Sequence, residues 1–171
     1  LLGAMSIDDE RNIHYIGTDP NRDHDTSIGR TKYHEFADFF NTKTTRALGT
    51  LYPKTHTYEI FQHGSEEISK DPKFQKYKGK LDLIFTSPPY FAKEAYSEDE
   101  EQSYKKFSQY DLWRDGFLRK TLETCVEYLK NDRYLLWNIA DAVFDGDMLP
   151  LEQDSMDILT SLGMQYQGKL K

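Results

Sequence analysis

The segment whose residue types could do chemistry is Ser87-Pro88-Pro89-Tyr90, which follows directly on the apolar run 81–86. The run predicts a buried strand. Two prolines cannot continue a central strand, because each fixes its own φ and lacks a donor for the ladder, so the chain should leave the sheet in a stiff, extended turn. Ligands bind at this edge of open α/β sheets. Rigid carbonyl groups beside an aromatic face could hold a planar ring that carries an amino group.

The stretch from Asp82 to Tyr90 resembles the catalytic strand and loop of the S-adenosylmethionine-dependent amino-methyltransferases. Members of that family carry Asp, Asn or Ser before Pro-Pro-Tyr or Pro-Pro-Phe, and they methylate the exocyclic nitrogen of adenine or cytosine in DNA. Some relatives act on RNA or on protein glutamine. The Ser form is commonest among the cytosine 4-amino enzymes. The competing interpretation of the same residues is a proline turn that closes a strand.

The resemblance implies a mechanism for the residues from Ser87 to Tyr90. The target base is flipped out of the double helix and stacks on Tyr90, while the Ser87 side chain and the Pro88 backbone carbonyl hold its amino hydrogens. Lone-pair density of the nitrogen is thereby directed toward the sulfonium methyl for direct transfer, so positioning and dipoles supply most of the catalysis. Pro89 completes the rigid corner. Ser87 cannot act as a general base at neutral pH, so the proton leaves to water or to a group that the motif does not identify.

Two further strand ends are candidates for binding the cofactor, S-adenosylmethionine. Asp19 follows a strand expected over 13–17, and the resemblance implies that its carboxylate accepts hydrogen bonds from the ribose hydroxyls. Gly64 and Ser65 follow a strand expected over 55–61, where relatives line the adenine ring with a small residue and then a polar one. The competing interpretations are structural: Asp19 braces its own Asp-Pro turn, and Ser65 caps the helix that follows it.

The segment after the motif contains two more candidate contacts. Phe91 could contact the base, and Tyr96 could contact either the base or the cofactor. The same segment carries the acidic run 98–101, which would repel phosphate. A solvated, mobile loop up to Gln102 is therefore the favoured interpretation of this segment.

Other residue types argue against other chemistries. Cys125 is the only cysteine and is expected on the apolar face of a helix, which disfavours a covalent thiolate mechanism and fits a reducing compartment such as the cytoplasm. The five histidines show no ligand spacing, so no metal site is predicted. Trp113 and Trp137 are expected in the core. No apolar stretch approaches the length of a membrane span.

Length and charge limit what the chain can do alone. Its 171 residues are enough for one domain, 1–171, with a substantial core. The formal charge of -7 is unusual for a protein that binds nucleic acid by itself, since phosphate binding normally uses a basic face. Double-stranded DNA with a flipped target base is the expected partner. Sequence recognition is expected to come from a domain or partner subunit outside this chain.

The hydrophobic periodicity predicts strands that alternate with helices, an order typical of an α/β fold with a doubly wound, mainly parallel sheet. The resemblance implies a Rossmann-like methyltransferase fold that is incomplete at the N-terminus, because the glycine-rich cofactor turn is not in this sequence. Leu1–Ala4 is similar to the beginning of the helix after that turn, which suggests a fragment; an expression scar at Gly3-Ala4-Met5 is the alternative. The expected elements are strands over 13–17, 55–61, 81–86, 134–139 and 164–170, and helices from Tyr33 to before Gly49, near Pro72, over 103–130, and over 151–162 with Gly163 as its cap. A polar loop is expected over 21–30, a break between helix and strand at Asn131-Asp132, and burial of the 134–139 strand on both faces.

The sequence therefore predicts the catalytic core of a DNA amino-methyltransferase, with cytosine slightly favoured over adenine as the target. Two alternatives stay open at this point. One is a related methyltransferase that acts on RNA or on protein glutamine through the same pocket. The other is a methyltransferase-like scaffold subunit that has lost cofactor binding.

Overall fold

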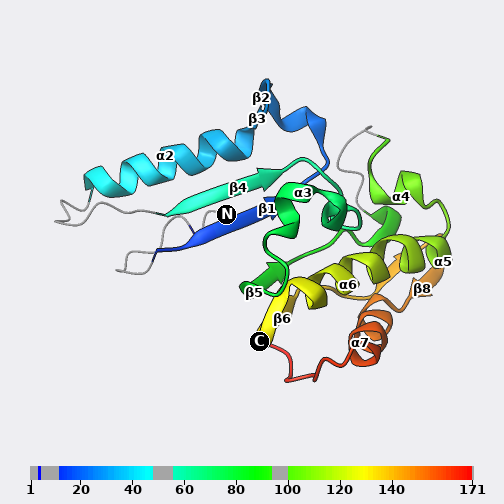
Figure 1. Ribbon diagram of the computed structural model, residues 1–171. Helices are drawn as coiled ribbons and strands as arrows, with labels where there is room; N and C mark the ends of the chain where they lie inside the picture. Colours follow the sequence, from blue (N-terminus) through cyan, green and yellow to red (C-terminus); the bar gives the residue numbers. More distant parts are fainter. Residues whose placement is uncertain (1–3, 5–11, 48–55, 94–99, 171) are drawn as a thin grey trace. The chain divides into compact units, whose positions relative to one another are not determined.

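The computed structural model describes residues 12–47, 56–93 and 100–170, together with Ala4. The chain divides into two compact units, Leu1–His63 and Gly64–Lys171. Each unit contains one pair of parallel strands and one small antiparallel hairpin (Figure 1). None of the helices in the described ranges has the length and apolar character needed to cross a membrane. The parallel pairs agree with the predicted α/β class, while a single doubly wound sheet and one domain over 1–171 stay predictions.

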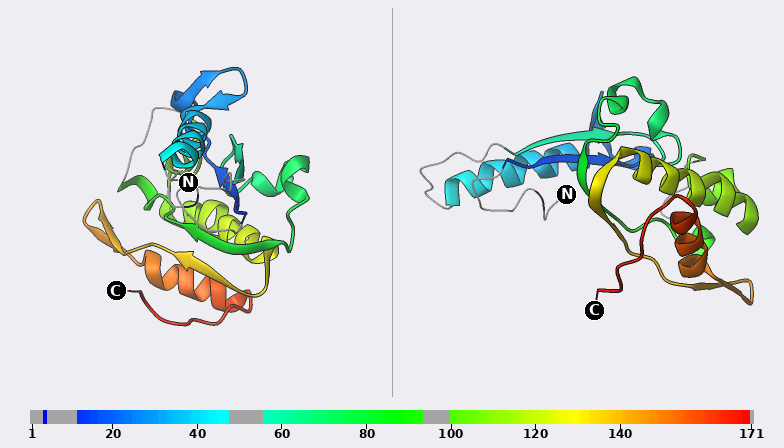
Figure 2. Two further views of the ribbon diagram at one scale, coloured as in Figure 1. Left: turned by 90° about the vertical axis from the view of Figure 1, so that its left-hand side faces the viewer. Right: turned by 60° about the horizontal axis from the view of Figure 1, so that its bottom comes forward.

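The first unit is built on the parallel pair β1 (His14–Thr18) and β4 (Thr57–Phe61). The pair is in continuous register, and α2 (Lys32–Ala47) connects the two strands and lies along them (Figure 2). Ala37 on α2 is fully buried. Both strands and the helix predicted for this region are confirmed within one or two residues.

A short antiparallel hairpin follows β1 at residues that were predicted to form a polar loop. Gly29 has a φ of 72°, which glycine adopts without steric cost and which lets the chain reverse over few residues. The prediction of an irregular loop is therefore wrong, because turn chemistry rather than an apolar face sets this pairing. The hairpin and the turn before it comprise η1 (Arg22–His24), β2 (Asp25–Ser27) and β3 (Arg30–Thr31).

The second unit is built on the parallel pair β5 (Leu81–Thr86) and β6 (Leu129–Trp137). At its start, Leu81 lies opposite Leu129, but Leu83 lies opposite Tyr134, so β6 carries additional residues there. Asp132 within them has a φ of 57°. A break between helix and strand was predicted at Asn131-Asp132, but the structure includes these residues in an irregular part of the strand.

The helix predicted over 103–130 is divided in the structure. Phe107 follows the first segment, and its ring lies against Gly116, where a Cβ would come within 2.3 Å of the Phe107 ring. This packing accounts for the interruption at Phe107, because its side chain could not reach Gly116 if one continuous helix contained both residues. The segments are α4 (Ser103–Lys106), α5 (Tyr110–Trp113), the π-helical η4 (Arg114–Leu118) and α6 (Arg119–Tyr128).

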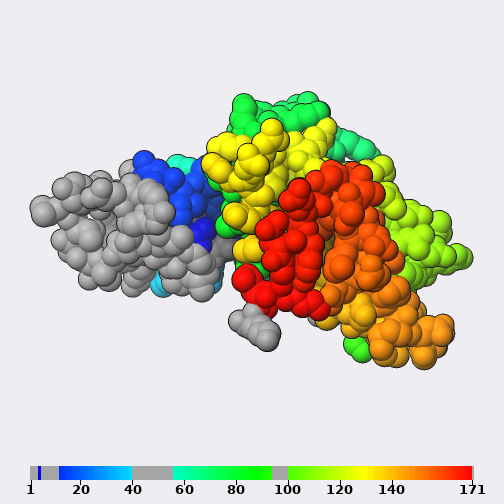
Figure 3. Space-filling model, turned by 90° about the horizontal axis from the view of Figure 1, so that it is seen from below, coloured from blue at the N-terminus to red at the C-terminus, as the bar shows by residue number. Residues whose placement is uncertain are grey.

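The C-terminal part of the second unit is a hairpin followed by a helix, formed by β7 (Ala142–Phe144), β8 (Asp147–Leu149) and α7 (Leu151–Ser161). The predicted helix is confirmed, and Gly163 follows it with a φ of 86°, as a C-terminal cap requires. The strand predicted over 164–170 is wrong. These residues have no regular secondary structure, and Lys169 pairs with Glu152 of α7 at 2.6 Å. Figure 3 shows the C-terminal residues in red beside β6 in yellow.

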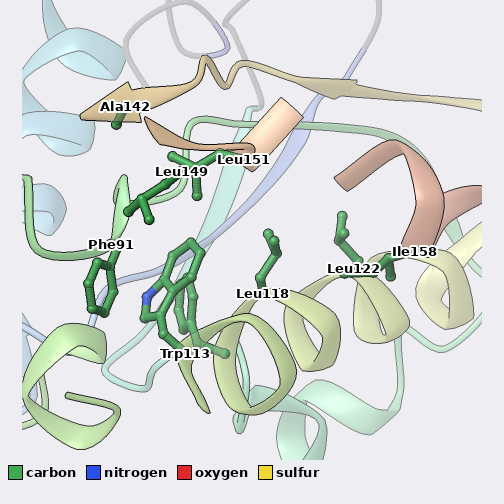
Figure 4. Close-up of a cluster of buried hydrophobic side chains, with 9 residues drawn as sticks. Phe91, Trp113, Leu118, Leu122, Ala142, Leu149, Leu151 and Ile158 are labelled. Atoms are coloured by element: carbon green, nitrogen blue, oxygen red, sulfur yellow. The ribbon is translucent and has the colours of Figure 1, made fainter. Parts of the chain in front are cut away.

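The core of the second unit is one cluster of apolar side chains contributed by the helices, the hairpin and the residue after the diproline motif (Figure 4). Trp113, Leu118, Leu122 and Leu151 are fully buried in it. Trp137 packs against the cluster, and its indole Nε1 donates to Ser155 Oγ at 3.2 Å. The expectation that both tryptophans belong to the core therefore agrees with the structure.

The β5–β6 pair is covered on one face only. Leu83, Phe85 and Tyr134 are exposed by 56%, 72% and 63% respectively. Leu135 and Trp137 alternate with them along β6 and pack against the core cluster. The prediction that β6 is buried on both faces is wrong, and β5 is less buried than its apolar run predicted. The helices and hairpin of this unit cover only the opposite face of its two-stranded sheet.

Candidate active site

The diproline corner lies at the carboxyl end of β5, as the sequence predicted. β5 ends at Thr86, Ser87 is exposed, and Pro88 is buried. Pro89 and Tyr90 are half-buried. The stiff backbone therefore leaves the sheet with the serine hydroxyl on the accessible side of the corner and one proline fixed in the protein.

The end of β6 brings Asn138 to this corner. Its backbone N–H donates to Thr86 O at 2.9 Å, which extends the parallel ladder one residue beyond the Thr86–Trp137 pair. Its side-chain Nδ2 donates to Ser87 Oγ at 3.4 Å. Asn138 was not among the site residues predicted from the sequence. The available signal was a polar residue directly after an apolar strand, since the carboxyl ends of neighbouring parallel strands meet at one edge.

Tyr90 lies between the core and the open side of the corner. Its ring packs against the apolar cluster, and its hydroxyl donates to the backbone carbonyl of Asn138 at 3.5 Å. The ring is only half-buried, so part of it stays accessible. An accessible, anchored ring of this kind can stack with a planar ligand.

Phe91 lies inside the core and is 3% exposed. Its ring makes edge contacts with Tyr110, Trp113 and Phe144, at centroid distances of 5.8, 5.8 and 5.1 Å. Figure 4 shows Phe91 beside Trp113. The predicted contact between Phe91 and a base does not agree with this burial. Its φ of 54° lies in the left-handed region, which costs about 1–3 kcal/mol for a residue other than glycine. Burial of the ring offsets that cost and fixes the end of the corner.

The acidic segment that follows the corner ends at Gln102, which is buried. Tyr96 lies outside the described residues. Gln102 is 7% exposed, and Glu101 Oε2 is 2.7 Å from Lys106 Nζ. The expectation of a solvated loop agrees with the exposure of Glu100 and Glu101 and is wrong only for Gln102, which is buried.

Glu66 lies buried over Gly64 in the turn that begins the second unit. A Cβ on Gly64 would lie 2.3 Å from Glu66 Oε2, so only glycine allows this close approach. Glu66 Oε1 is 3.2 Å from Lys106 Nζ, whereas Oε2 is buried and has no hydrogen-bond partner among the residues that the structure describes. Burial disfavours the charge on Lys106, but the hydrogen bond that its ammonium donates to the Glu101 carboxylate and the negative charge of Glu66 raise its pKa above the ordinary value. Oε2 is an acceptor that a bound donor could use.

Ser65 does not cap the helix that follows it. Its hydroxyl shares a hydrogen bond of 2.9 Å with Thr121 Oγ1 on α6. The next helical turn, η2 (Ile68–Lys70), has Glu67 at its N-cap position with no side-chain cap. Ser65 therefore ties this turn to α6, and it lies directly beside Gly64.

Asp19 lies at the carboxyl end of β1 in the first unit, and its backbone N–H donates to Phe61 O at 3.1 Å. Its carboxylate accepts hydrogen bonds from the Asn21 backbone N–H at 2.9 Å and from the Tyr33 hydroxyl at 2.5 Å. Burial and this contact with Asp19 raise the pKa of Tyr33 well above its ordinary value. The bracing role considered for Asp19 is therefore present in the structure.

Metal coordination and thiolate chemistry at Cys125 are two alternatives to a site at the diproline corner. Within the part of the chain that the structure describes, no group of three or more His, Cys, Asp or Glu is arranged to hold a metal ion. Cys125 is buried on α6, and burial raises the pKa of its thiol to about 12. The thiol is therefore protonated at neutral pH and unsuited to nucleophilic attack.

Comparison with known proteins gives a family for the region that holds the diproline corner. A family model described as DNA methylase, for N6 and N4 methyltransferases, matches residues 81–169, which is more than half of the chain. The match begins with the first residue of β5 and includes both the corner and Asn138. No match to the chain was found among curated proteins or among solved structures. The chain therefore belongs to the DNA methylase family of N6 and N4 amino methyltransferases.

Proposed function

We propose that this chain transfers a methyl group from S-adenosylmethionine to the exocyclic amino group of cytosine or adenine in DNA. Cytosine is slightly favoured because the motif begins with serine. The observation that carries the proposal is the placement of the Ser87 hydroxyl and the Tyr90 ring together at the carboxyl end of a parallel strand pair. Membership of the DNA methylase family supports DNA as the molecule that is methylated.

Ser87 and Pro88 act as the acceptors for the target amine. The exposed Ser87 Oγ accepts one amino hydrogen, and the backbone carbonyl of Pro88 accepts the other. The base stacks on the accessible part of Tyr90, and such stacking contributes about 1–3 kcal/mol per base. Phe91 anchors the corner from within the core, and Tyr96 is a further proposed contact for the base. The proton lost from the amine leaves to solvent, because Ser87 stays protonated at neutral pH.

S-adenosylmethionine supplies an electrophilic sulfonium methyl group when it is bound. Gly64 and Ser65 are the residues of the second unit that we propose to hold it. The buried Glu66 Oε2 beside them, which no described residue contacts with a hydrogen bond, suits the amino group of an adenine ring. Asp19 is the proposed acceptor for the ribose hydroxyls. It already accepts two hydrogen bonds, but a carboxylate has about four lone-pair sites, so capacity for a ligand remains.

The charge of the chain bears on how DNA is held. The formal charge is -7, so the sequence as a whole does not provide the basic face that normally neutralises phosphate. We propose that a recognition domain or partner subunit outside this chain supplies that face and the sequence specificity. The corner itself then acts on one extruded base.

The test is methyl transfer to unmethylated DNA by the full-length protein, with the product nucleosides measured by mass spectrometry. Ser87→Ala and Tyr90→Ala are each expected to lower the yield of N4-methylcytosine or N6-methyladenine by roughly 10²-fold or more, because each removes a group that positions the base. Ser108→Ala and Tyr166→Ala change exposed residues of the same types and should leave the yield unchanged.

Three outcomes would contradict the proposal. Full activity in both site variants would remove the site assignment. Methylation of RNA or of glutamine peptides in preference to DNA would replace the substrate. Calorimetry that shows no binding of S-adenosylmethionine to the full-length protein would instead identify a scaffold subunit.

A further inference from the structure

We propose that Asn138 is a positioning residue of the methyl-transfer site, which holds the Ser87 hydroxyl and the Tyr90 ring in a fixed relation to each other. The inference rests on the proposed function and adds to it a residue from the neighbouring strand. Three observations support this role: the strand register, the two hydrogen bonds that join Asn138 to the motif, and the lack of a second hydrogen-bond partner for its side chain among the described residues.

The register of the sheet fixes where Asn138 lies. Thr86 is opposite Trp137, and the bond from Asn138 N–H to Thr86 O at 2.9 Å continues the ladder to the next residue. Asn138 is therefore the residue of β6's end that faces Ser87 at β5's end. A residue placed by a strand is held more precisely than one placed by a loop. The position of Asn138 is therefore better fixed than that of Ser87, and Asn138 can restrict the Ser87 side chain.

The side chain of Asn138 restricts Ser87. A free serine hydroxyl rotates among three staggered positions, and Ser87 is exposed. The bond from Asn138 Nδ2 at 3.4 Å occupies one lone pair of Ser87 Oγ and leaves the second lone pair for an amino hydrogen of the base. Hydrogen bonds at catalytic sites are often long without substrate and shorten when it binds. We expect this bond to shorten when a base excludes water from the corner.

The backbone of Asn138 ties Tyr90 to the same point. The Tyr90 hydroxyl donates to the Asn138 carbonyl at 3.5 Å. The Tyr90 ring and the Ser87 hydroxyl are therefore both hydrogen-bonded to Asn138. Among the described residues, Ser87 is the only hydrogen-bond partner of the Asn138 carboxamide. The side chain is also exposed, so packing does not account for its position.

The experiment is a double-mutant cycle on the full-length protein, with Asn138→Ala, Ser87→Ala and the double variant. Steady-state methyl transfer to unmethylated DNA gives kcat and KM for each. We expect Asn138→Ala to lower kcat by roughly 10-fold to 100-fold with little change in the KM for DNA. In the Ser87→Ala background the same change should lower kcat less than about threefold, because the partner through which Asn138 acts is already gone.

Asn138→Asp supplies the rescue. A carboxylate of the same shape can accept the Ser87 O–H in place of the original donation, so kcat should recover several-fold relative to Asn138→Ala, while the added negative charge raises the KM for DNA. A structural role alone would not produce this separation of kcat from KM. Thermal unfolding checks each variant, and Asn138→Ser replaces Asn138→Ala in the cycle if the alanine variant is unstable.

The outcomes separate the two proposals. An active wild-type protein in which Asn138→Ala has the same effect on kcat with and without Ser87 would overturn the positioning role and leave the proposed function intact. An effect confined to KM would overturn it as well. A wild-type protein that binds S-adenosylmethionine but methylates no DNA would overturn the proposed function and, with it, this inference.

Discussion

The carboxyl ends of β1 and β5 differ, although each strand belongs to a parallel pair in its own unit. At the end of β1, the Asp19 carboxylate already accepts hydrogen bonds from Tyr33 and Asn21. At the end of β5, Ser87 is exposed and has one long hydrogen bond, from Asn138. The same local architecture therefore closes one strand end with internal hydrogen bonds and leaves the polar group of the other available.

Asp19 therefore stabilises the fold in addition to its proposed contact with the ribose, whereas Ser87 contributes little to stability and its acceptor capacity is available to a ligand. A polar group whose hydrogen bonds are satisfied within the protein contributes to stability, whereas an available one at a strand end is suited to a ligand. The open end of β5 is not loosely built, because Phe91 and Trp113 are buried directly beyond it. An accessible hydroxyl on a rigid support is the combination that a positioning site requires.

The largest expected effect tests whether the buried Phe91 ring supports the open end of β5. Phe91→Ala removes a buried ring and should lower the free energy of unfolding by about 3–5 kcal/mol, measured by urea denaturation. Phe85→Ala is the control, since that ring is 72% exposed on β5, the strand that leads into the corner, and its loss should change stability by less than about 0.5 kcal/mol. Equal losses in the two variants would contradict the support.

A second substitution pair tests the comparison directly. Asp19→Ala removes the acceptor for Tyr33 and Asn21 and should destabilise the protein by about 1–3 kcal/mol. Ser87→Ala removes one long bond at an exposed position and should change stability by less than about 0.5 kcal/mol. If Ser87→Ala proved as destabilising as Asp19→Ala in urea, the distinction between a closed and an open end would fail.

The smallest effect concerns alkaline pH. The pKa of Tyr33 is raised in the folded protein, so its contribution to stability is complete below the unfolded value of about 10 and is lost as pH rises through the folded value. Tyr33→Phe cannot ionise, so its unfolding free energy should fall less steeply than that of the wild type between about pH 9 and 11. If the unfolding free energies of the two proteins fell in parallel with pH, the raised pKa of Tyr33 at the closed end of β1 would be contradicted.

Local signals were sufficient to predict the corner. Two prolines after an apolar run end a strand whatever the rest of the chain does, so Ser87 and Tyr90 could be placed at a sheet edge from the sequence alone. Asn138 could not, because its contact with Ser87 spans 51 residues and depends on the register between β5 and β6. Phe91 was predicted to contact the base, because the sequence next to it does not reveal its packing partners. Its burial depends on Trp113, which tertiary packing brings to it.

The helices show the same division between local and tertiary causes. Periodicity correctly predicted α2 and α7, because each has an apolar face of its own. It did not predict the interruption at Phe107, which arises where that ring packs on Gly116. The burial of β5 and β6 was overestimated because an apolar strand pattern does not specify how many faces the unit covers.

The irregular start of β6 has a consequence for changes in chain length. The additional residues lie around Asp132, at the end of the strand pair remote from the corner, and Lys130 Nζ is held there by Asp82 at 2.6 Å. From Leu83 opposite Tyr134 onward, the pairing is unbroken. An insertion or deletion near Asp132 would be absorbed in the irregular part before it altered any later pair. Evolution can therefore lengthen or shorten this connection while the spacing between the last residues of the two strands is preserved.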